Sequence, residues 1–162
     1  MNLEKLLENT FKCAYWDKYK EDLEKEDYDS TLKNLNDIKE RICLFAPNRK
    51  DLHNAINENI DVDYIKQMIE HNAIEPQYIF KLIVYIVEKI KEFDCIANEG
   101  FHEAWKAKTC LALEEKGKLS EVFPDFFKEC FFRIEKIEYE IECFKKTEIY
   151  AAMKRKIEEK NN

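Results

Sequence analysis

The sequence predicts an all-α protein, a single-domain helical bundle of about six to eight helices. Only two glycines and three prolines occur in 162 residues, whereas an all-β domain with many turns needs more of both. Apolar residues also recur every three or four positions, which is the spacing of an amphipathic helix. Because 45% of the residues are hydrophobic, the chain can bury a core of the size expected for one domain.

The first predicted helix covers residues 3 to about 26 and is amphipathic. Its apolar residues at helical spacing are Leu3, Leu6, Leu7, Phe11, Ala14 and Tyr15. A break follows in EDYDSTLKNL, where Asp29, Ser30 or Thr31 can cap the next helix. That second helix ends before Pro47. Its single apolar stripe consists of Leu32, Leu35, Ile38, Ile42 and Phe45.

Two shorter helices come next. The apolar residues of the first are Leu52, Ala55 and Ile56. Asp61 opens the second as its N-cap. The residues of this helix expected to face inward are Val62, Ile65, Met68 and Ile69. His71 falls in the last turn, where the helix dipole favours a cationic imidazole, so Glu70-His71 indicates a helix end rather than a catalytic pair.

The central helix begins at Glu75-Pro76, with proline in the first turn where its missing N–H is not needed. Its apolar residues are Ile79, Leu82, Ile83, Ile86, Val87, Ile90 and Phe93. Because these side chains cover well over half of the circumference, neighbours should bury the helix on several sides. Residues 79–93 are therefore the predicted centre of the domain.

For the rest of the chain, the sequence predicts a turn at 98–100, a helix over 101–116 and two further helices. Gly117 is the expected C-cap of the first of these, and Ser120 and Pro124 open the long helix. The stripe of the long helix is Phe123, Phe127, Cys130, Ile134, Ile137, Ile141 and Phe144. The last helix, over 147–160, adds Ile149, Met153 and Ile157 before Asn161-Asn162 frays. The domain organisation expected is an N-terminal helix over 1–28, a core over 29–146 and a C-terminal helix over 147–162.

Charge and hydropathy exclude two classes of partner. A formal net charge of −7 at pH 7 argues against nucleic-acid binding, because phosphate contacts need a basic surface. The N-terminus MNLEKLLENTFK carries charges throughout and does not resemble a signal peptide. The most apolar run, Tyr78–Val87, contains Lys81 and is far shorter than the ~20 residues of a membrane-spanning helix. We therefore expect a soluble, cytoplasmic protein with no membrane span.

The cysteines and glycines lack the spacing of known functional motifs. The six thiols, none in a Cys-x-x-Cys pair, are Cys13, Cys43, Cys95, Cys110, Cys130 and Cys143. Most fall on apolar stripes, so we expect reduced and mostly buried thiols rather than a zinc site or a disulfide framework. Gly100 and Gly117 are isolated, whereas a phosphate-binding loop needs clustered glycines.

No catalytic, cofactor or metal site is predicted. Glu99 and His102 have the Glu-x-x-His spacing that di-iron bundles use twice, but it occurs here once. Asp61 and Asp63 resemble a metal-binding pair, although acidic residues in a first turn also stabilise the helix dipole. Three glutamates of the long helix are expected on an exposed face: Glu135, Glu138 and Glu142. An unrecognised helical enzyme or metalloprotein is a third hypothesis, which metal analysis of the purified protein would test.

One family resemblance rests on the segment IKERICLFAPNRKDLHNAINENIDVDYIKQMIEHNAIEPQYIFKLIVYIVEKI. This segment resembles the N-terminal part of the T-complex protein 11 domain. The matching positions are Asp61, Asp63, Ile65, Lys66, Gln67, Glu70, His71 and Ala73. A weaker similarity in FPDFFKECFFRIEKIEYEIECF extends the resemblance to roughly residues 32–145, and 32–93 is its main part. Asn72 stands where the family has glycine, but asparagine also tolerates the left-handed conformation. Family domains are longer, so the chain would be a short or truncated member.

The resemblance implies a helical fold without assigned catalytic residues, a role in protein interaction and a link to cyclic-AMP-dependent signalling. The predicted function is therefore a non-enzymatic interaction module, an adaptor or regulator, whose partner is another protein. Trp16 and Tyr19 are candidate binding anchors because aromatic residues dominate hot spots, and the alternative is that both cap the core.

The alternative function is a structural subunit or homo-oligomer of a larger assembly. Its interface would come from the first and last helices. The abundance of Lys, Glu, Asn and Ile fits an AT-rich genome, such as that of a protist or a large DNA virus, so this assembly could be viral.

Overall fold

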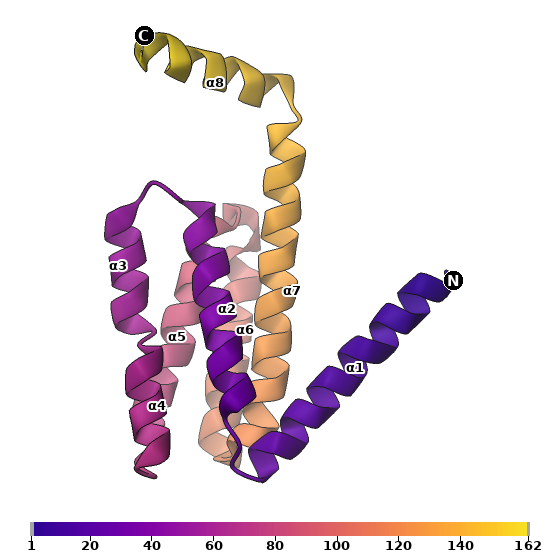
Figure 1. Cartoon of the computed structure of the whole chain (residues 1–162), viewed down its shortest axis with the longest axis vertical. Coiled ribbons are helices and arrows are strands. Elements are labelled where there is room, and N and C mark those ends of the chain that lie inside the picture. The colour runs from indigo at the N-terminus through magenta and orange to yellow at the C-terminus, as the bar shows by residue number, and fades with distance from the viewer. Residues whose placement is uncertain (1, 162) are drawn as a thin grey trace.

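Eight α-helices and one short 3₁₀ helix form the secondary structure of residues 2–161, the part of the chain that the computed structural model describes (Figure 1). The helices are α1 (Leu3–Glu24), α2 (Asp29–Phe45), α3 (Lys50–Asn59), α4 (Val62–Glu70), α5 (Pro76–Phe93), η1 (Ile96–Asn98), α6 (Glu99–Lys116), α7 (Leu119–Lys145) and α8 (Glu148–Asn161). No strand occurs in this part of the chain, so the predicted all-α class is confirmed.

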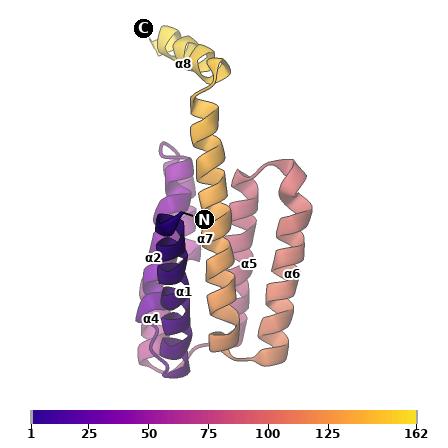
Figure 2. The ribbon, with the colours of Figure 1, turned by 90° about the vertical axis from the view of Figure 1, so that its right-hand side faces the viewer.

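The helices α2, α5, α6 and α7 stand side by side, and α3 and α4 follow one another along the outside of the bundle (Figures 1 and 2). The long helix α7 packs against α1, α2, α5 and α6 and rises beyond the others. The helix α1 meets the base of the bundle at its C-terminal end and diverges from it toward the N-terminus. The helix α8 lies above the bundle and follows directly from α7.

The core forms where the predicted apolar stripes meet. Buried residues on α5 are Ile79, Leu82, Ile83, Ile86, Val87 and Ile90, which confirms this helix as a central one. Buried residues on α7 include Phe123, Phe127, Cys130, Ile134 and Ile137, as the spacing predicts. Ile141 is only half-buried and Phe144 is exposed, because the end of α7 extends above the other helices.

The ends of α4 and α6 confirm three expectations. The Asp61 carboxylate accepts the Tyr64 backbone N–H at 3.0 Å, as an N-cap does. At the other end of α4, Asn72 has a φ of +50°. There the Ala73 N–H donates to the Met68 carbonyl at 2.8 Å, and the Asn72 N–H to the Ile69 carbonyl at 3.1 Å. This is the Schellman arrangement, and Gly117, with φ +64°, ends α6 in the same left-handed region.

Three local predictions were wrong. The helix α2 begins at Asp29 rather than after it, because the Asp27 carboxylate accepts the Asp29 N–H at 3.1 Å. Gly100 lies in the first turn of α6, since the chain has already turned at η1. Pro124 lies inside α7, which begins at Leu119. At this position its ring removes one helical hydrogen bond, the bond to the carbonyl of Ser120.

The cysteines are less buried than expected. Cys130 is buried in the core, and this burial raises the pKa of its thiol. Cys13, Cys95 and Cys143 are exposed. They lie on the outer part of α1, in the link after α5 and on the free end of α7, where no helix covers them. The prediction of mostly buried thiols was therefore wrong for half of the set.

The left-handed residue after the end of α1 gives a testable prediction of stability. Glu26 has a φ of +59°, and the Asp27 N–H donates to the Asp22 carbonyl at 2.8 Å in a second Schellman arrangement. A side chain is strained in this region and glycine is not, so we expect Glu26→Gly to raise the free energy of unfolding by about 1 kcal/mol. Urea denaturation followed by circular dichroism measures this change. Glu24→Gly, inside the last turn of α1, is the matched control and should lower it by about 0.5–1 kcal/mol.

Candidate functional site

The predicted motif residues lie along α4 and its ends and do not converge on a site. Ile65 is buried in the core, and Asp61 caps the helix. The other motif positions, Asp63, Gln67, Glu70 and His71, are exposed. His71 is the C-cap, and its backbone N–H donates to the Gln67 carbonyl at 3.1 Å. Across residues 2–161, no group of three or more His, Cys, Asp or Glu side chains is arranged to hold a metal ion.

The candidate anchors on α1 face the bundle. Tyr19 is buried, and its hydroxyl lies 2.7 Å from the Thr31 hydroxyl of α2. This burial raises the pKa of the phenol above its ordinary value. Trp16 is half-buried, with its ring 6.1 Å from that of Phe131 on α7. In this arrangement both side chains attach α1 to the bundle, and Tyr19 is not accessible to a partner.

A buried polar network that the sequence did not reveal joins α5, α6 and α7. Asp94 follows the last residue of α5, His102 lies on α6 and Arg133 on α7. His102 is only 1% exposed. Its Nε2 lies 2.6 Å from a carboxylate oxygen of Asp94, and its Nδ1 lies 2.9 Å from a guanidinium nitrogen of Arg133. Since a guanidinium can only donate, Nδ1 accepts from Arg133 and the Nε2–H donates to Asp94.

Each end of this network is held by further partners. Burial acts to raise the pKa of Asp94, but hydrogen bonds from His102, Asn98 and the Cys95 N–H outweigh it and leave that pKa below its ordinary value. Arg133 also pairs with Glu129, four residues earlier on α7, at 2.8 Å. Its guanidinium lies 4.5 Å from the centre of the Trp105 ring, so it faces α6 rather than solvent.

The network holds helices together and leaves no ring nitrogen of His102 free to react. A general base needs a free ring nitrogen, but both nitrogens of His102 are engaged. Glu99 does not join His102 as a ligand, because its carboxylate lies 3.5 Å from the Lys91 ammonium. On the long helix, Glu138 pairs with Arg41 of α2 rather than standing free on an exposed face.

A groove of about 810 Å³ lies between α6 and α7. Its floor includes Trp105, Thr109 and Phe126, which are buried. Phe101 on α6 and Phe132 on α7 border it with 67% and 62% of their surfaces exposed. Arg133 also lines this groove and lies against the Trp105 ring, so the network reaches the groove.

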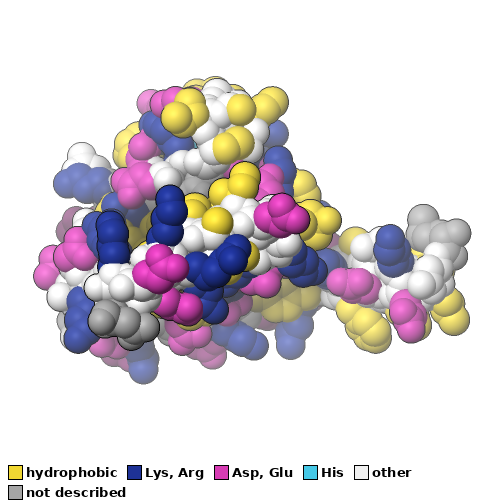
Figure 3. Space-filling view, turned by 90° about the horizontal axis from the view of Figure 1, so that it is seen from above, with side chains coloured by type: hydrophobic (Ala, Val, Ile, Leu, Met, Phe, Trp, Pro, Cys, Tyr) yellow, Lys and Arg dark blue, Asp and Glu magenta, His cyan; other side chains and the backbone are white. Residues whose placement is uncertain are grey.

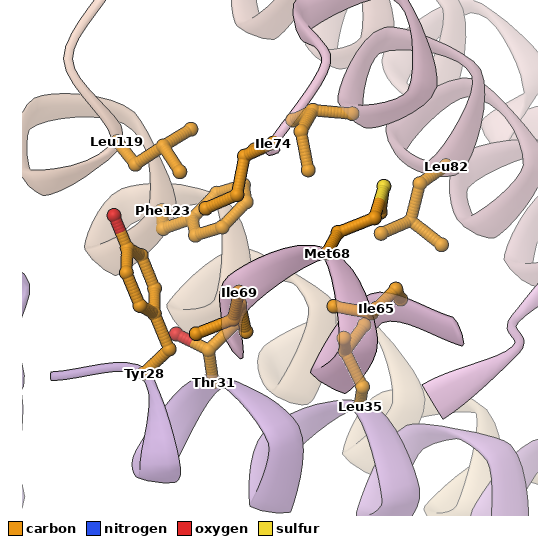
Figure 4. A pocket seen from close by; sticks show the side chains of 11 residues that line it. Tyr28, Thr31, Leu35, Ile65, Met68, Ile69, Ile74, Leu82, Leu119 and Phe123 are labelled. Carbon is orange, nitrogen blue, oxygen red and sulfur yellow. The ribbon is translucent and has the colours of Figure 1, made fainter. Parts of the chain in front are cut away.

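A second concavity lies inside the core, between α2, α4, α5 and α7 (Figure 4). It measures about 10 Å³ and its lining includes Leu35, Met68 and Phe123. A space of this size holds about one water molecule at most. Its lining is apolar except for Tyr28 and Thr31, and the Thr31 hydroxyl is already paired with that of Tyr19. We interpret it as a packing gap rather than a ligand site.

Comparison with known proteins identifies the family. A family model described as T-complex protein 11 matches residues 2–90, which is more than half of the chain. The chain belongs to the T-complex protein 11 family. The match begins at residue 2, in contrast to the expected start near residue 32, and it ends at residue 90, within α5. The segment FPDFFKECFFRIEKIEYEIECF, which also resembles the family, lies outside this match.

A curated member of the T-complex protein 11 family shares part of this sequence. T-complex protein 11 homolog of Homo sapiens is 34% identical over 86 residues, a stretch that covers 51% of this chain and 17% of the human protein. No solved structure matches the chain. Within residues 2–161, none of the helices combines the length and the apolar character that crossing a bilayer requires.

The polar network predicts a stability effect. Asp94→Ala leaves the buried Nε2–H of His102 without an acceptor, so we expect the free energy of unfolding to fall by about 1–3 kcal/mol. Chemical denaturation measures this loss. Glu114→Ala, an exposed carboxylate on α6, is the control and should stay within about 0.5 kcal/mol of the wild type. Equal effects of the two substitutions would contradict the role of Asp94.

The same carboxylate predicts a pH dependence. Because its folded-state pKa is below the ordinary value of 3.8, the charge on Asp94 stabilises the fold fully above that pH. Its contribution should be lost as the pH falls from 3.8 through the lowered folded-state value. The measurement is the difference in unfolding free energy between the wild type and Asp94→Asn as a function of pH. A difference that stays constant into this acid range would argue against the prediction.

Proposed function

We propose that this protein is a non-enzymatic protein–protein interaction module, an adaptor or regulator, that binds an amphipathic helix of another protein between α6 and α7. The observation that carries the proposal is the α6–α7 groove, with its buried aromatic floor and its two exposed phenylalanines. Proteins without a binding partner rarely expose large contiguous apolar patches. An apolar groove between helices is also a common receptor for a partner helix.

The shape and charge of the groove define the partner. The two helices pack against each other, with α6 at the edge of the bundle (Figure 2). A third helix laid along them would pack as the helices of the bundle pack on each other. The borders carry both signs of charge, with Lys108 and Lys128 near Glu121 and Asp125. A fitting partner helix therefore has an apolar stripe flanked by both basic and acidic side chains.

A non-enzymatic role is supported by the saturation of the one buried histidine. His102 is buried and both of its ring nitrogens are engaged, so it offers no free base to a substrate. The expected cytoplasmic location is part of the proposal, and so is a role in cyclic-AMP-dependent signalling, which the family resemblance implies. The chain aligns with only 17% of the human relative, so the role of that whole protein is not transferred here.

Charge introduced at the groove should abolish partner binding. We expect Phe101→Glu/Phe132→Glu to remove the proteins captured by the tagged full chain from its native cells, as identified by mass spectrometry. Leu44→Glu/Ile96→Glu is the matched control, because both residues are exposed apolar side chains outside the groove. All variants should melt as the wild type does, since none of the four residues is buried. Partners that survive the groove substitutions but not the control would refute this site.

We infer self-association as a second candidate function. If the chain is of viral origin, the larger assembly is viral. Self-association is favoured by the apolar residues that α1 and α8 leave exposed, among them Phe11 and Ile149. This surface is separate from the α6–α7 groove.

A further inference from the structure

The helix α1 carries two apolar faces. In its C-terminal half, Tyr19 and Leu23 are buried and Trp16 packs beside Phe131 of α7. In its N-terminal half, Leu3, Leu6 and Leu7 are all exposed by half or more of their surfaces. Figure 3 shows this half projecting from the body of the protein with hydrophobic side chains along it.

The two faces point in opposite directions. At 100° per residue, the mean direction of Leu3, Leu6 and Leu7 differs by roughly 160° from that of the bundle-facing set Trp16, Tyr19 and Leu23. The bundle of the same chain therefore cannot cover the N-terminal face while the C-terminal face holds its place. Whatever covers the first face must approach from the side away from α7.

The helix α8 presents a matching row. Ile149, Met153 and Ile157 recur at every fourth residue and are 66%, 50% and 59% exposed. On α1, a row with the same spacing is Leu3, Leu7 and Phe11, which are 68%, 50% and 72% exposed. None of the residues of α8 is buried. Rows of this spacing are the ridges that interdigitate when two helices pack in the commonest class of helix pair.

The charges beside the two rows are complementary. Projected at 100° per residue, Lys156 and Lys160 lie together on one side of the α8 row and Lys154 lies on the other side, whereas the glutamates of this helix lie toward the opposite face. On α1, Glu4 and Glu8 each follow a leucine of the row and lie together on one flank. Opposite charges beside an apolar contact favour the pairing of unlike helices over the pairing of like ones.

The geometry points to a reciprocal dimer in which the α1 row of each copy packs on the α8 row of the other. This inference rests on the second candidate function and specifies its interface. Within one chain the two rows stay apart. The helix α8 lies above the bundle, and the N-terminal end of α1 lies beside the bundle, well below α8 (Figures 1 and 2). In a two-fold dimer, both apolar rows of each copy are covered, so no row is left to bind a third copy.

Mixing two variants tests this pairing. Leu3→Glu/Leu7→Glu destroys only the α1 row, and Met153→Glu/Ile157→Glu destroys only the α8 row. All four residues are exposed, so both proteins should keep the melting temperature of the wild type. Sedimentation velocity on the full chain should give a dimer for the wild type and a monomer for each variant alone. A mixture of the two should form a heterodimer, because it retains one intact α1 row facing one intact α8 row.

Any other outcome of these sedimentation experiments would contradict the reciprocal dimer. A monomeric wild type at every concentration would exclude the dimer, and a series of larger species would exclude the closed two-fold form. A variant that still dimerises alone would indicate pairing of α1 with α1 or of α8 with α8. Failure of the mixture to associate would exclude reciprocal pairing. The Phe101→Glu/Phe132→Glu protein should remain dimeric, so loss of partner binding and loss of self-association are measured separately.

Reversing the charges provides an independent test. Glu4→Lys/Glu8→Lys should weaken the dimer, and adding Lys156→Glu/Lys160→Glu, the two lysines on one side of the α8 row, should restore it at low salt. Continued weakness of the combined variant would contradict contact between these two flanks.

Discussion

The burial of one side-chain row on α7 is the constraint on which the rest of the fold depends. Phe127, Cys130 and Ile134 are at most 1% exposed, and α7 packs against α1, α2, α5 and α6. Two of these helices, α1 and α2, begin the chain, and the other two, α5 and α6, come shortly before α7, which brings them together. The hydrophobic free energy gained by covering this row offsets part of the conformational entropy that the chain loses when these helices become ordered.

The part of the chain that matches the T-complex protein 11 family depends on α7, which lies outside the match, to cover its apolar surface. The family match ends at residue 90, within α5. Yet the residues of α1 and α2 inside the match pack on α7, which lies outside it. The matched region therefore does not bury its own apolar surface alone. In this chain, residues beyond the match complete the core, and they also form the α6–α7 groove.

The network of Asp94, His102 and Arg133 connects this core to the groove. It ties the end of α5 to α6 and α7 at the depth of the groove floor, where Trp105 covers the guanidinium of Arg133. A buried polar group is costly unless it is fully hydrogen-bonded, so such a network favours one relative position of the helices that contribute to it. The width of the groove follows from that position.

The sequence by itself determined the helices and the core-facing residues of α5 and α7, because periodicity and capping are local properties. Asp61, Asn72 and Gly117 show this, since the Asp61 carboxylate caps α4 and the left-handed conformations of Asn72 and Gly117 end α4 and α6. Tertiary structure alone decided which apolar rows become covered. The rows of α1 and α8 have the same spacing as buried ones but remain exposed. It also decided the position of His102, whose partners are 8 and 31 residues away in the chain. Contacts between distant residues depend on how helices pack, and no local pattern contains that information.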